Sequence, residues 1–259
     1  MTAVLIYHAP IDFDAVLAWL GARAIPGIER IEAGTYIRGD VRVWHEQNEV
    51  RTNGDEARVR RLFDLDFDPA PMHALFARDE MLAPLLRKRP GVRVPGAWDP
   101  FELAVRAIVG QQVSVAGART ILGRIAAEHG FDPAVLAEVT LGGMPRTRAE
   151  TIQRLARAVL DREVILQVED RQSCLSRSSL PNEKGDREDC LSSTLTAIRG
   201  IGPWTANYIA MRLGERDAFP AGDLILRRNA GNLTERALHR RAEAWRPFRA
   251  YAAMLLWMG

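Results

Sequence analysis

The feature that most constrains the fold is a pair of glycines, Gly200 and Gly202, between two stretches with helical periodicity. In the first stretch, apolar residues recur at i, i+4 and i+7: Leu191, Leu195 and Ile198. The second stretch repeats a helical spacing in Ala206, Ile209, Ala210 and Leu213. Because glycine weakens a helix interior, we expect a helix-hairpin-helix at about residues 191–214, with its second helix starting at Thr205.

Such a hairpin is suited to binding a phosphate backbone. Glycine lets another backbone approach closely, and the free N–H groups at a helix start attract an anion. We therefore expect Gly200, Gly202 and Thr205 to contact nucleic acid without reading its sequence. The alternative is an ordinary turn in an all-helical core. The full spacing, Leu-x-x-Ile-x-Gly-Ile-Gly-x-x-Thr-Ala, is much narrower than a lone Gly-x-Gly and favours DNA binding.

Length and composition exclude several other classes of protein. A chain of 259 residues can form one large or two modest domains. Its 47% hydrophobic and 26% charged residues are ordinary for a globular protein, and no apolar run approaches the roughly 18 residues that span a bilayer. The first residues lack the basic region and cleavage site of an export signal. We expect a cytoplasmic protein with no membrane association.

Basic charge gathers near the hairpin, although the net charge is only +2. Residues 191–259 hold ten arginines and five acidic residues, as expected of a surface that faces phosphates. A solvated arginine-rich helix face is the alternative. The two cysteines, Cys174 and Cys190, are too few for an iron–sulfur cluster, which needs about four. A disulfide between them is not expected in a reducing compartment.

The first seventy residues read as mixed α/β. Strands are predicted at 4–7, within 28–37, at 41–44 and at 49–51, and helices after Asp12 and Asp55. From about residue 71 the pattern turns helical. We therefore predict an α+β fold, with a small N-terminal antiparallel α/β domain at 1–75 and an all-helical part at 76–259.

Local signals place the helices of the second part. Asp99-Pro100-Phe101-Glu102 is a capping box with proline at the first helical position. Ser114 starts the next helix, which ends near Gly130, and another runs through Ile152, Leu155 and Val159. Residues 167–190 are polar and patternless, so we predict a surface loop there.

Six segments carry a resemblance to a known family. They are RLFDL at 61–65, RPGVRVPG at 89–96, FELAVRAIVGQQVSVA at 101–116, RGIGPWTANY at 199–208, FPAGD at 219–223 and WRPFRAYAAMLLW at 245–257. In them the chain resembles the helix-hairpin-helix DNA glycosylase superfamily, and within it the AlkA-type 3-methyladenine DNA glycosylases. The resemblance implies a helical glycosylase core that acts in base excision repair. It also implies a monomer without an organic cofactor, which hydrolyses the N-glycosidic bond of alkylated bases in double-stranded DNA.

The resemblance implies that Asp223 is the catalytic carboxylate. A base must be flipped out of the stack before its N-glycosidic bond can be broken. That reaction develops positive charge on the sugar, which a nearby carboxylate stabilises. The alternative is a helix N-cap, since the apolar Leu224, Ile225 and Leu226 follow. The two roles can coexist.

Four aromatic residues are expected to form the base pocket: Trp204, Tyr208, Trp257 and Trp19. Electron-rich rings suit a cationic alkylbase, whereas ordinary core packing is the alternative. Trp204 also stands two residues after the second hairpin glycine, where superfamily members that cleave the backbone carry lysine. Without that amine no Schiff base forms, so we expect a monofunctional enzyme without lyase activity.

The turn at Gln111, Gln112 and Ser114 is expected to contact DNA at the gap left by the flipped base. The AlkA-type archetype has leucine at the position of Gln112, whereas glutamine could hydrogen-bond base edges. A plain interhelical turn is the alternative. The resemblance further suggests a sodium or potassium ion on the backbone carbonyls of Ile198 and Gly200. Two alternative functions remain open: a glycosylase for oxidised or deaminated bases, and a non-catalytic DNA-damage-binding protein.

Overall fold

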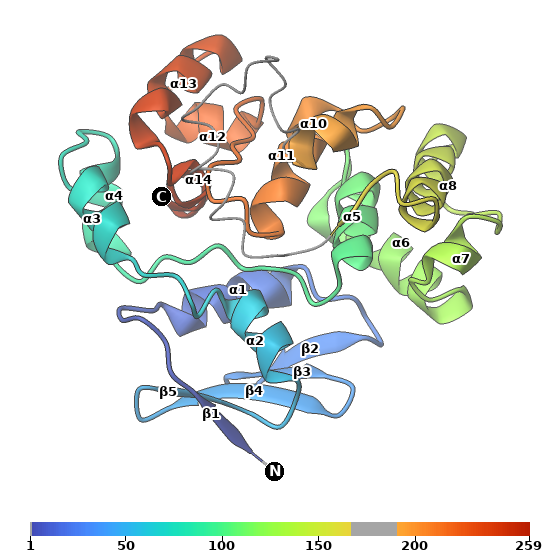
Figure 1. Cartoon of the computed structure of the whole chain (residues 1–259), viewed down its shortest axis with the longest axis horizontal. Coiled ribbons are helices and arrows are strands. Elements are labelled where there is room, and N and C mark those ends of the chain that lie inside the picture. Colours follow the sequence, from blue (N-terminus) through green and yellow to red (C-terminus); the bar gives the residue numbers. More distant parts are fainter. Residues whose placement is uncertain (1, 167–190) are drawn as a thin grey trace, which may run out of the picture.

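The computed structural model describes residues 2–166 and 191–259. The loop predicted at 167–190, with Cys174 and Cys190, lies outside the described residues. The N-terminal part is a five-stranded antiparallel sheet in the order β1-β5-β4-β3-β2 (Figure 1). Its strands are β1 (Ala3–Leu5), β2 (Glu29–Glu32), β3 (Thr35–Arg38), β4 (Val41–Glu46) and β5 (Glu49–Thr52). The antiparallel sheet predicted from the sequence is thus confirmed.

Two helices, α1 (Phe13–Ala22) and α2 (Glu56–Phe63), lie between the sheet and the rest of the molecule (Figure 1). Both begin at the predicted acidic caps. The Asp12 carboxylate accepts a hydrogen bond from the Ala15 amide at 3.0 Å, and the Asp55 carboxylate accepts one from the Arg58 amide at 2.8 Å. Each bond satisfies an amide of the first helical turn, which is why these helices start where they do.

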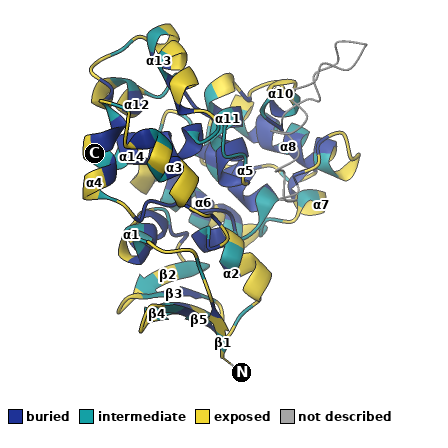
Figure 2. Cartoon of the chain, turned by 60° about the vertical axis from the view of Figure 1, so that its left-hand side comes forward, coloured by how far each residue is buried: buried dark blue, intermediate teal, exposed yellow. Residues whose placement is uncertain are grey.

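The remainder is helical, as predicted. Its helices are α3 (Ala70–Phe76), α4 (Leu82–Lys88), α5 (Pro100–Val109), α6 (Val115–Glu128), α7 (Pro133–Leu136), α8 (Arg146–Leu160), α10 (Leu191–Thr196), α11 (Pro203–Arg212), α12 (Leu224–Asn229), α13 (Glu235–Ala242), η1 (Glu243–Trp245) and α14 (Arg249–Met258). They form two groups above the sheet, with α5 to α8 on one side and α12 to α14 on the other (Figure 1). In Figure 2, α5 and α11 are dark over much of their length because most of their residues are buried.

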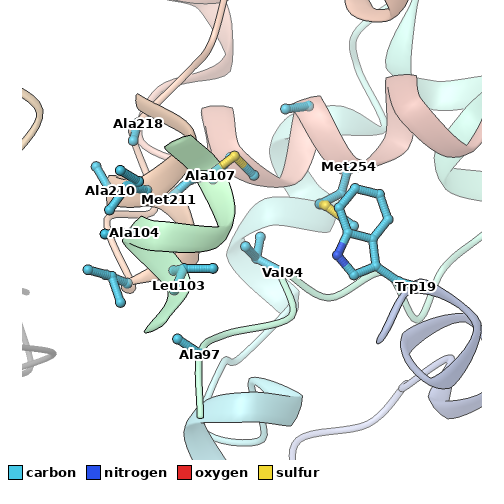
Figure 3. Close-up of a cluster of buried hydrophobic side chains, with 14 of the residues drawn as sticks. Trp19, Val94, Ala97, Leu103, Ala104, Ala107, Ala210, Met211, Ala218 and Met254 are labelled. Atoms are coloured by element: carbon cyan, nitrogen blue, oxygen red, sulfur yellow. The ribbon is translucent and has the colours of Figure 1, made fainter. Parts of the chain in front are cut away.

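Small side chains bring α5 close to α11. Leu103, Ala104 and Ala107 of α5 gather opposite Ala210 and Met211 of α11 (Figure 3). All five are buried, so this contact fixes the second hairpin helix against the centre of the molecule. On the other side of the same close-up, Trp19 of α1 lies next to Met254 of α14.

The capping box at the start of α5 is only half formed. Asp99 accepts a hydrogen bond from the Glu102 amide at 2.8 Å, which confirms the predicted cap. The return bond that a capping box implies, donated by the Asp99 amide to the Glu102 carboxylate, is not formed. That carboxylate is buried and binds the guanidinium groups of Arg38 and Arg106 instead. A charge-assisted pair is stronger than a bond to a neutral amide.

The division of the chain at residue 75 stays a prediction. α3 spans this position, and Asp79 accepts hydrogen bonds from Arg241 at 2.5 Å and from the Trp245 indole at 2.8 Å. These bonds tie the segment after α3 to the C-terminal helices. Within residues 2–166 and 191–259, no helix combines the length and the apolar character that crossing a membrane requires.

Candidate active site and DNA-binding surface

The predicted hairpin is present, with shifted helix ends. α10 stops at Thr196, before Ile198, and α11 begins at Pro203, two residues earlier than expected. Proline is favoured at the first helical position, where its missing amide costs nothing. Gly202 is the cap of α11 and has an ordinary φ of −85°.

The two hairpin glycines differ in whether the fold requires glycine at their positions. Gly200 has a φ of +104°, and a Cβ there would lie 2.0 Å from the Thr151 hydroxyl oxygen. Its conformation and its surroundings therefore both require glycine. A Cβ at Gly202 would meet no described atom within 4 Å. The described fold therefore does not require glycine at that position, and contact of Gly202 with DNA stays a prediction.

Two predicted DNA-binding residues turn out to brace the hairpin. The Gln111 amide donates to the Gly200 carbonyl at 3.2 Å and to the Thr205 hydroxyl at 2.9 Å. Thr205 is only 3% exposed. Its side chain is buried and already bonded, so contact with DNA through the backbone at Thr205 stays a prediction. Gln111 shares this internal role and joins the turn after α5 to the hairpin.

The adjacent Gln112 is exposed and has a φ of +55°, in the left-handed region. A non-glycine residue pays a conformational cost there, and such positions cluster at functional sites. The Ser114 hydroxyl caps α6 by accepting a hydrogen bond from the Gly117 amide at 3.1 Å. The turn therefore projects one polar side chain, that of Gln112, outward from between two helices. Contact of Gln112 and Ser114 with DNA stays a prediction.

A cavity of about 380 Å³ lies between the N-terminal part and the two helix groups, and all five predicted active-site residues line it. Trp204 and Tyr208 stack one turn apart on α11, with ring centroids 5.5 Å apart and planes 9° apart. The Trp257 ring of α14 meets the Tyr208 ring edge-on, with centroids 6.2 Å apart. It lies at a tilt of 36° to the Trp19 ring, with centroids 5.6 Å apart. The structure thus brings together residues that are far apart in the sequence.

Asp223 sits on the wall of this cavity and is held by four donors. Its Oδ1 accepts from the amides of Ile225 at 2.9 Å and Leu226 at 3.0 Å, which confirms the N-cap of α12. The same oxygen accepts from the Trp257 indole N–H at 3.0 Å, and Oδ2 accepts from the Trp204 indole N–H at 2.9 Å. The two tryptophans therefore fix the carboxylate as well as lining the cavity.

Four arginines that the sequence analysis missed also line the cavity, and two of them, Arg23 and Arg212, contact pocket aromatics. Arg212 is buried and donates to the Tyr208 hydroxyl at 2.8 Å and to the Gly96 carbonyl at 2.8 Å. Burial alone raises the pKa of Tyr208, but Arg212 and Arg23 outweigh it and hold that pKa below its usual value. Both arginines stand four residues after a pocket aromatic, and this i, i+4 spacing was a usable signal.

Arg23 changes the role expected of Trp19. Its guanidinium carbon lies 3.5 Å from the centroid of the Trp19 ring. One face of that ring is therefore already covered by a cation. The prediction that Trp19 lines the pocket agrees with its position, but the covered face cannot also stack on a cationic base.

A buried charge network supports the side of the cavity nearest the sheet. Arg106 lies 2.7 Å from Glu29 and 2.5 Å from Glu102, and Arg38 joins both acids. Burial raises the pKa of Glu29, but Arg106 and a hydrogen bond from Tyr36 outweigh it and lower that pKa overall. The two acids and two arginines balance in charge. This network links the β-sheet to α5.

A second hollow, of about 320 Å³, lies beside the hairpin and includes Gln112 and Gly200. It also includes Arg148 and Arg154 of α8 and the exposed Arg199. The first two lie outside the segment whose charge the sequence analysis counted. This hollow places basic groups on the same surface as the projecting glutamine.

Some of the arginines that the sequence analysis assigned to a phosphate-facing surface form ion pairs within the protein. Arg249 and Arg246 bind Asp217 at 2.7 Å and 2.5 Å, and Arg241 binds Asp79. These arginines of the C-terminal helices form ion pairs that join elements of the fold. The excess of arginine over acid after residue 191 therefore overstates the charge available to DNA.

The two hairpin carbonyls that the resemblance assigns to a monovalent cation each accept a hydrogen bond from within the protein, and cation binding there stays a prediction. The Ile198 carbonyl accepts from the Ile201 amide at 3.0 Å, and the Gly200 carbonyl accepts from Gln111. Each keeps one lone pair, and neutral oxygens suit a weakly charged ion. Among the described residues, no group of three His, Cys, Asp or Glu side chains could hold a metal ion.

Comparison with known proteins agrees with this geometry. The AlkA N-terminal domain family matches residues 51–99. The chain is 34% identical to a probable bifunctional transcriptional activator/DNA repair enzyme AlkA of Mycobacterium tuberculosis, over 96% of this chain, and spans about half of that protein's length (55%). It is 30% identical to DNA-3-methyladenine glycosylase 2 of Escherichia coli, over 97% of this chain and 95% of that protein.

A solved structure of a 3-methyladenine DNA-glycosylase from Archaeoglobus fulgidus superposes with a TM-score of 0.74. It covers 100% of this chain and 97% of its own, at 19% identity, and so supports the fold alone. The identity to the Escherichia coli protein extends over nearly all of both chains. The chain belongs to the AlkA family of DNA-3-methyladenine glycosylases.

Proposed function

We propose that this protein is a DNA glycosylase that hydrolyses the N-glycosidic bond of alkylated bases, chiefly of the 3-methyladenine type, in duplex DNA. The observation that carries the proposal is the Asp223 carboxylate, held by two indole N–H groups on the wall of an aromatic cavity. A cavity of about 380 Å³ is large enough to receive a flipped purine. The reaction would serve base excision repair.

The residues suggest the following course of reaction. The lesion leaves the base stack and enters the cavity beside the paired rings of Trp204 and Tyr208. As the bond to the sugar breaks, its electron pair goes to the base and positive charge develops on the sugar. The Asp223 carboxylate faces that charge and stabilises it. Because its four hydrogen bonds fix it beforehand, little reorganisation is needed in the transition state. Water then adds to the sugar and releases a proton to the solvent.

DNA would be held by the hairpin and the basic hollow next to it. Gly202 can bring the α11 amides close to a phosphate, and Gln112 can enter the space left by the flipped base. Arg148, Arg154 and Arg199 would contact the backbone on the same surface. A sodium or potassium ion on the carbonyls of Ile198 and Gly200 would add a positive charge there. The protein would act as a monomer.

We infer that the enzyme has no lyase activity. Trp204 stands where a lyase would need lysine. The chain has two lysines, Lys88 and Lys184; Lys88 is exposed on α4 and does not line the cavity. Lys184 lies outside the described residues. The product should be an intact abasic strand that breaks only after alkali, and borohydride should trap no protein–DNA adduct. A trapped adduct would refute this inference.

Release of 3-methyladenine from methylated duplex DNA tests the main proposal. The wild-type protein should release the free base and leave abasic sites, whereas Asp223→Asn should not at a comparable rate. Binding to methylated DNA without release would indicate a damage-binding protein instead. Release of oxidised or deaminated bases with no release of 3-methyladenine would indicate the other alternative.

A further inference from the structure

The turn between α5 and α6 separates two hollows. Gly110 and Val113 line the aromatic cavity. Gln111 and Gln112, which lie between them in the sequence, line the hollow of about 320 Å³ beside the hairpin instead. Among the described residues, the two hollows share no lining residue. The turn is therefore a wall, with the aromatic cavity on one side and the hairpin hollow on the other.

The hairpin hollow carries an excess of positive charge. Three arginines line it, Arg148, Arg154 and Arg199, together with one acidic residue, Glu150. The Glu150 carboxylate is held by Arg154 at 2.9 Å and by Arg146, on the same helix, at 2.8 Å. That acid is therefore already neutralised, and two of the three lining arginines keep their charge for a ligand.

Arg199 offers an accessible charge on a fixed backbone. Its side chain is exposed, and within residues 2–166 and 191–259 no acid forms an ion pair with it. Its carbonyl accepts from the Thr151 hydroxyl and from the Arg154 guanidinium, both at 3.3 Å. The main chain is thus bound to α8 while the guanidinium stays free. A guanidinium binds phosphate through paired, charge-assisted hydrogen bonds.

The hollow and the turn form one connected unit. Arg148 of α8 donates to the Gln111 carbonyl. The Gln111 side-chain amide in turn donates to the Gly200 carbonyl at 3.2 Å and to the Thr205 hydroxyl at 2.9 Å. These bonds join α8, the turn and the hairpin, so the position of the hollow relative to the aromatic cavity is fixed before DNA arrives.

The amides at the start of α11 belong to the other side of the wall. Trp204, in the first turn of α11, lines the aromatic cavity. Gly202, the cap of this helix, is not among the described residues that line the hairpin hollow. A phosphate bound by the α11 amides would therefore lie near the base that enters the cavity, on the strand that carries the lesion.

We propose that the hairpin hollow binds phosphates of the strand opposite the lesion, with Arg199 as the contacting guanidinium. A nucleotide turned out into the aromatic cavity leaves its own strand on the cavity side of the gap. With Gln112 in that gap, the complementary strand lies beyond the turn, where the basic hollow is. This contact would make binding depend on a double-stranded substrate. The inference rests on the proposed glycosylase function.

The test removes charge from one DNA strand at a time. The probe is a duplex with one tetrahydrofuran abasic analogue. Uncharged methylphosphonates replace the phosphates either opposite the analogue, in the complementary strand, or next to it, in its own strand. Replacement in the complementary strand should weaken wild-type binding about tenfold, the usual cost of one hydrogen bond to a charged group.

Arg199→Gln should bind the unmodified duplex about tenfold more weakly than wild type. Replacement in the complementary strand should then weaken its binding less than about twofold, because the contact is already absent. Replacement in the analogue strand should affect both proteins equally. Arg199→Lys, which keeps the charge, should recover part of the affinity. Arg30→Gln on β2 is the matched control, since it removes an exposed arginine that lines neither hollow.

Two further measurements distinguish the strands. Arg199→Gln should bind a single-stranded oligonucleotide with the same analogue as tightly as wild type does. On the duplex, the slope of log affinity against log salt should fall by about 0.9, the value for one lost phosphate contact. Equal losses on single-stranded and duplex DNA would overturn the inference.

The decisive result needs no variant. Wild-type binding that stays unchanged when the complementary strand loses these charges overturns the inference. The same wild-type preparation is assayed for release of 3-methyladenine from methylated duplex DNA. Release without the complementary-strand effect removes the inference and leaves the proposed function intact, whereas an enzyme that releases no base overturns the function.

Discussion

Replacing Asp223 by asparagine separates the charge of the carboxylate from its structural role as a helix cap. Asparagine caps a helix as well as aspartate does, so the two amide bonds to α12 should survive. Three of the four donors converge on Oδ1, which places the asparagine oxygen at that position. The new NH₂ group then faces the Trp204 indole N–H across the former 2.9 Å bond, and two donors oppose each other.

Both effects have an expected magnitude. A unit charge about 4 Å from a developing cation contributes about 4 kcal/mol at an effective dielectric of about 20. That corresponds to about 10³-fold in rate. Because the cavity is partly open to solvent, which screens the charge, we expect a loss of at least about 10²-fold in excision. The unsatisfied Trp204 N–H should cost about 1–3 kcal/mol of stability.

The assay is single-turnover release of 3-methyladenine from methylated duplex DNA, with urea unfolding measured in parallel. Asp132→Asn is the matched control, because Asp132 caps α7 through the Ala134 amide at 2.8 Å, outside the cavity. Adding Trp204→Phe to Asp223→Asn removes the opposing donor and should recover stability without recovering excision. Affinity for abasic-site DNA should change little. Turnover near that of wild type in Asp223→Asn would refute the catalytic assignment.

Three further substitutions test other parts of the structure. Gly202→Arg should fold normally, since its Cβ would meet no described atom within 4 Å. It should nevertheless weaken binding to damaged and undamaged duplexes alike. Unchanged binding would exclude the hairpin as the DNA anchor. Gly200→Ala, at a φ of +104° and against Thr151, should instead lower the melting temperature, and a melting curve equal to that of wild type would contradict the packing argument. Burial raises the pKa of Asp64 to about 6 from 3.8, against a hydrogen bond from Tyr251, so the folded state keeps its proton to higher pH than the unfolded state. Its stabilising effect is present below about pH 4 and lost as the pH rises through 6, a change of up to about 3 kcal/mol. Asp64→Asn should remove that dependence. The difference in unfolding free energy between Asp64→Asn and wild type, measured in urea, should therefore change between pH 4 and pH 7. A difference that is equal at both pH values would contradict the assignment.

Local patterns predicted the elements that depend on local causes. The caps at Asp12, Asp55 and Asp99 each satisfy an amide three residues onward, and such bonds can be predicted from neighbouring residues in the sequence. The hairpin could be located for the same reason. Its exact ends could not, because Thr151 of α8 and Gln111 of the α5–α6 turn contact it from a distance in the chain.

The resemblance predicted which residues face the cavity, and the structure explains what they do there. Nothing in the spacing of Trp204, Asp223 and Trp257 indicates that both indoles donate to one carboxylate. That arrangement depends on how α11, α12 and α14 cross, which is a property of the whole helical body.

Trp19 and Arg23 show how the N-terminal part contributes to the cavity. Arg23, the C-cap of α1, follows Trp19 by four residues, and the sequence contains that spacing. The contacts of this segment with α5 and α14 place the pair on the wall of the cavity that Asp223 also lines. The Glu29–Arg106 pair fastens the sheet to α5, and Arg106 in turn holds the Arg23 carbonyl. The small α/β part therefore does more than flank a helical core: it supplies Trp19 and Arg23 to the cavity wall and part of the contacts that keep them in place.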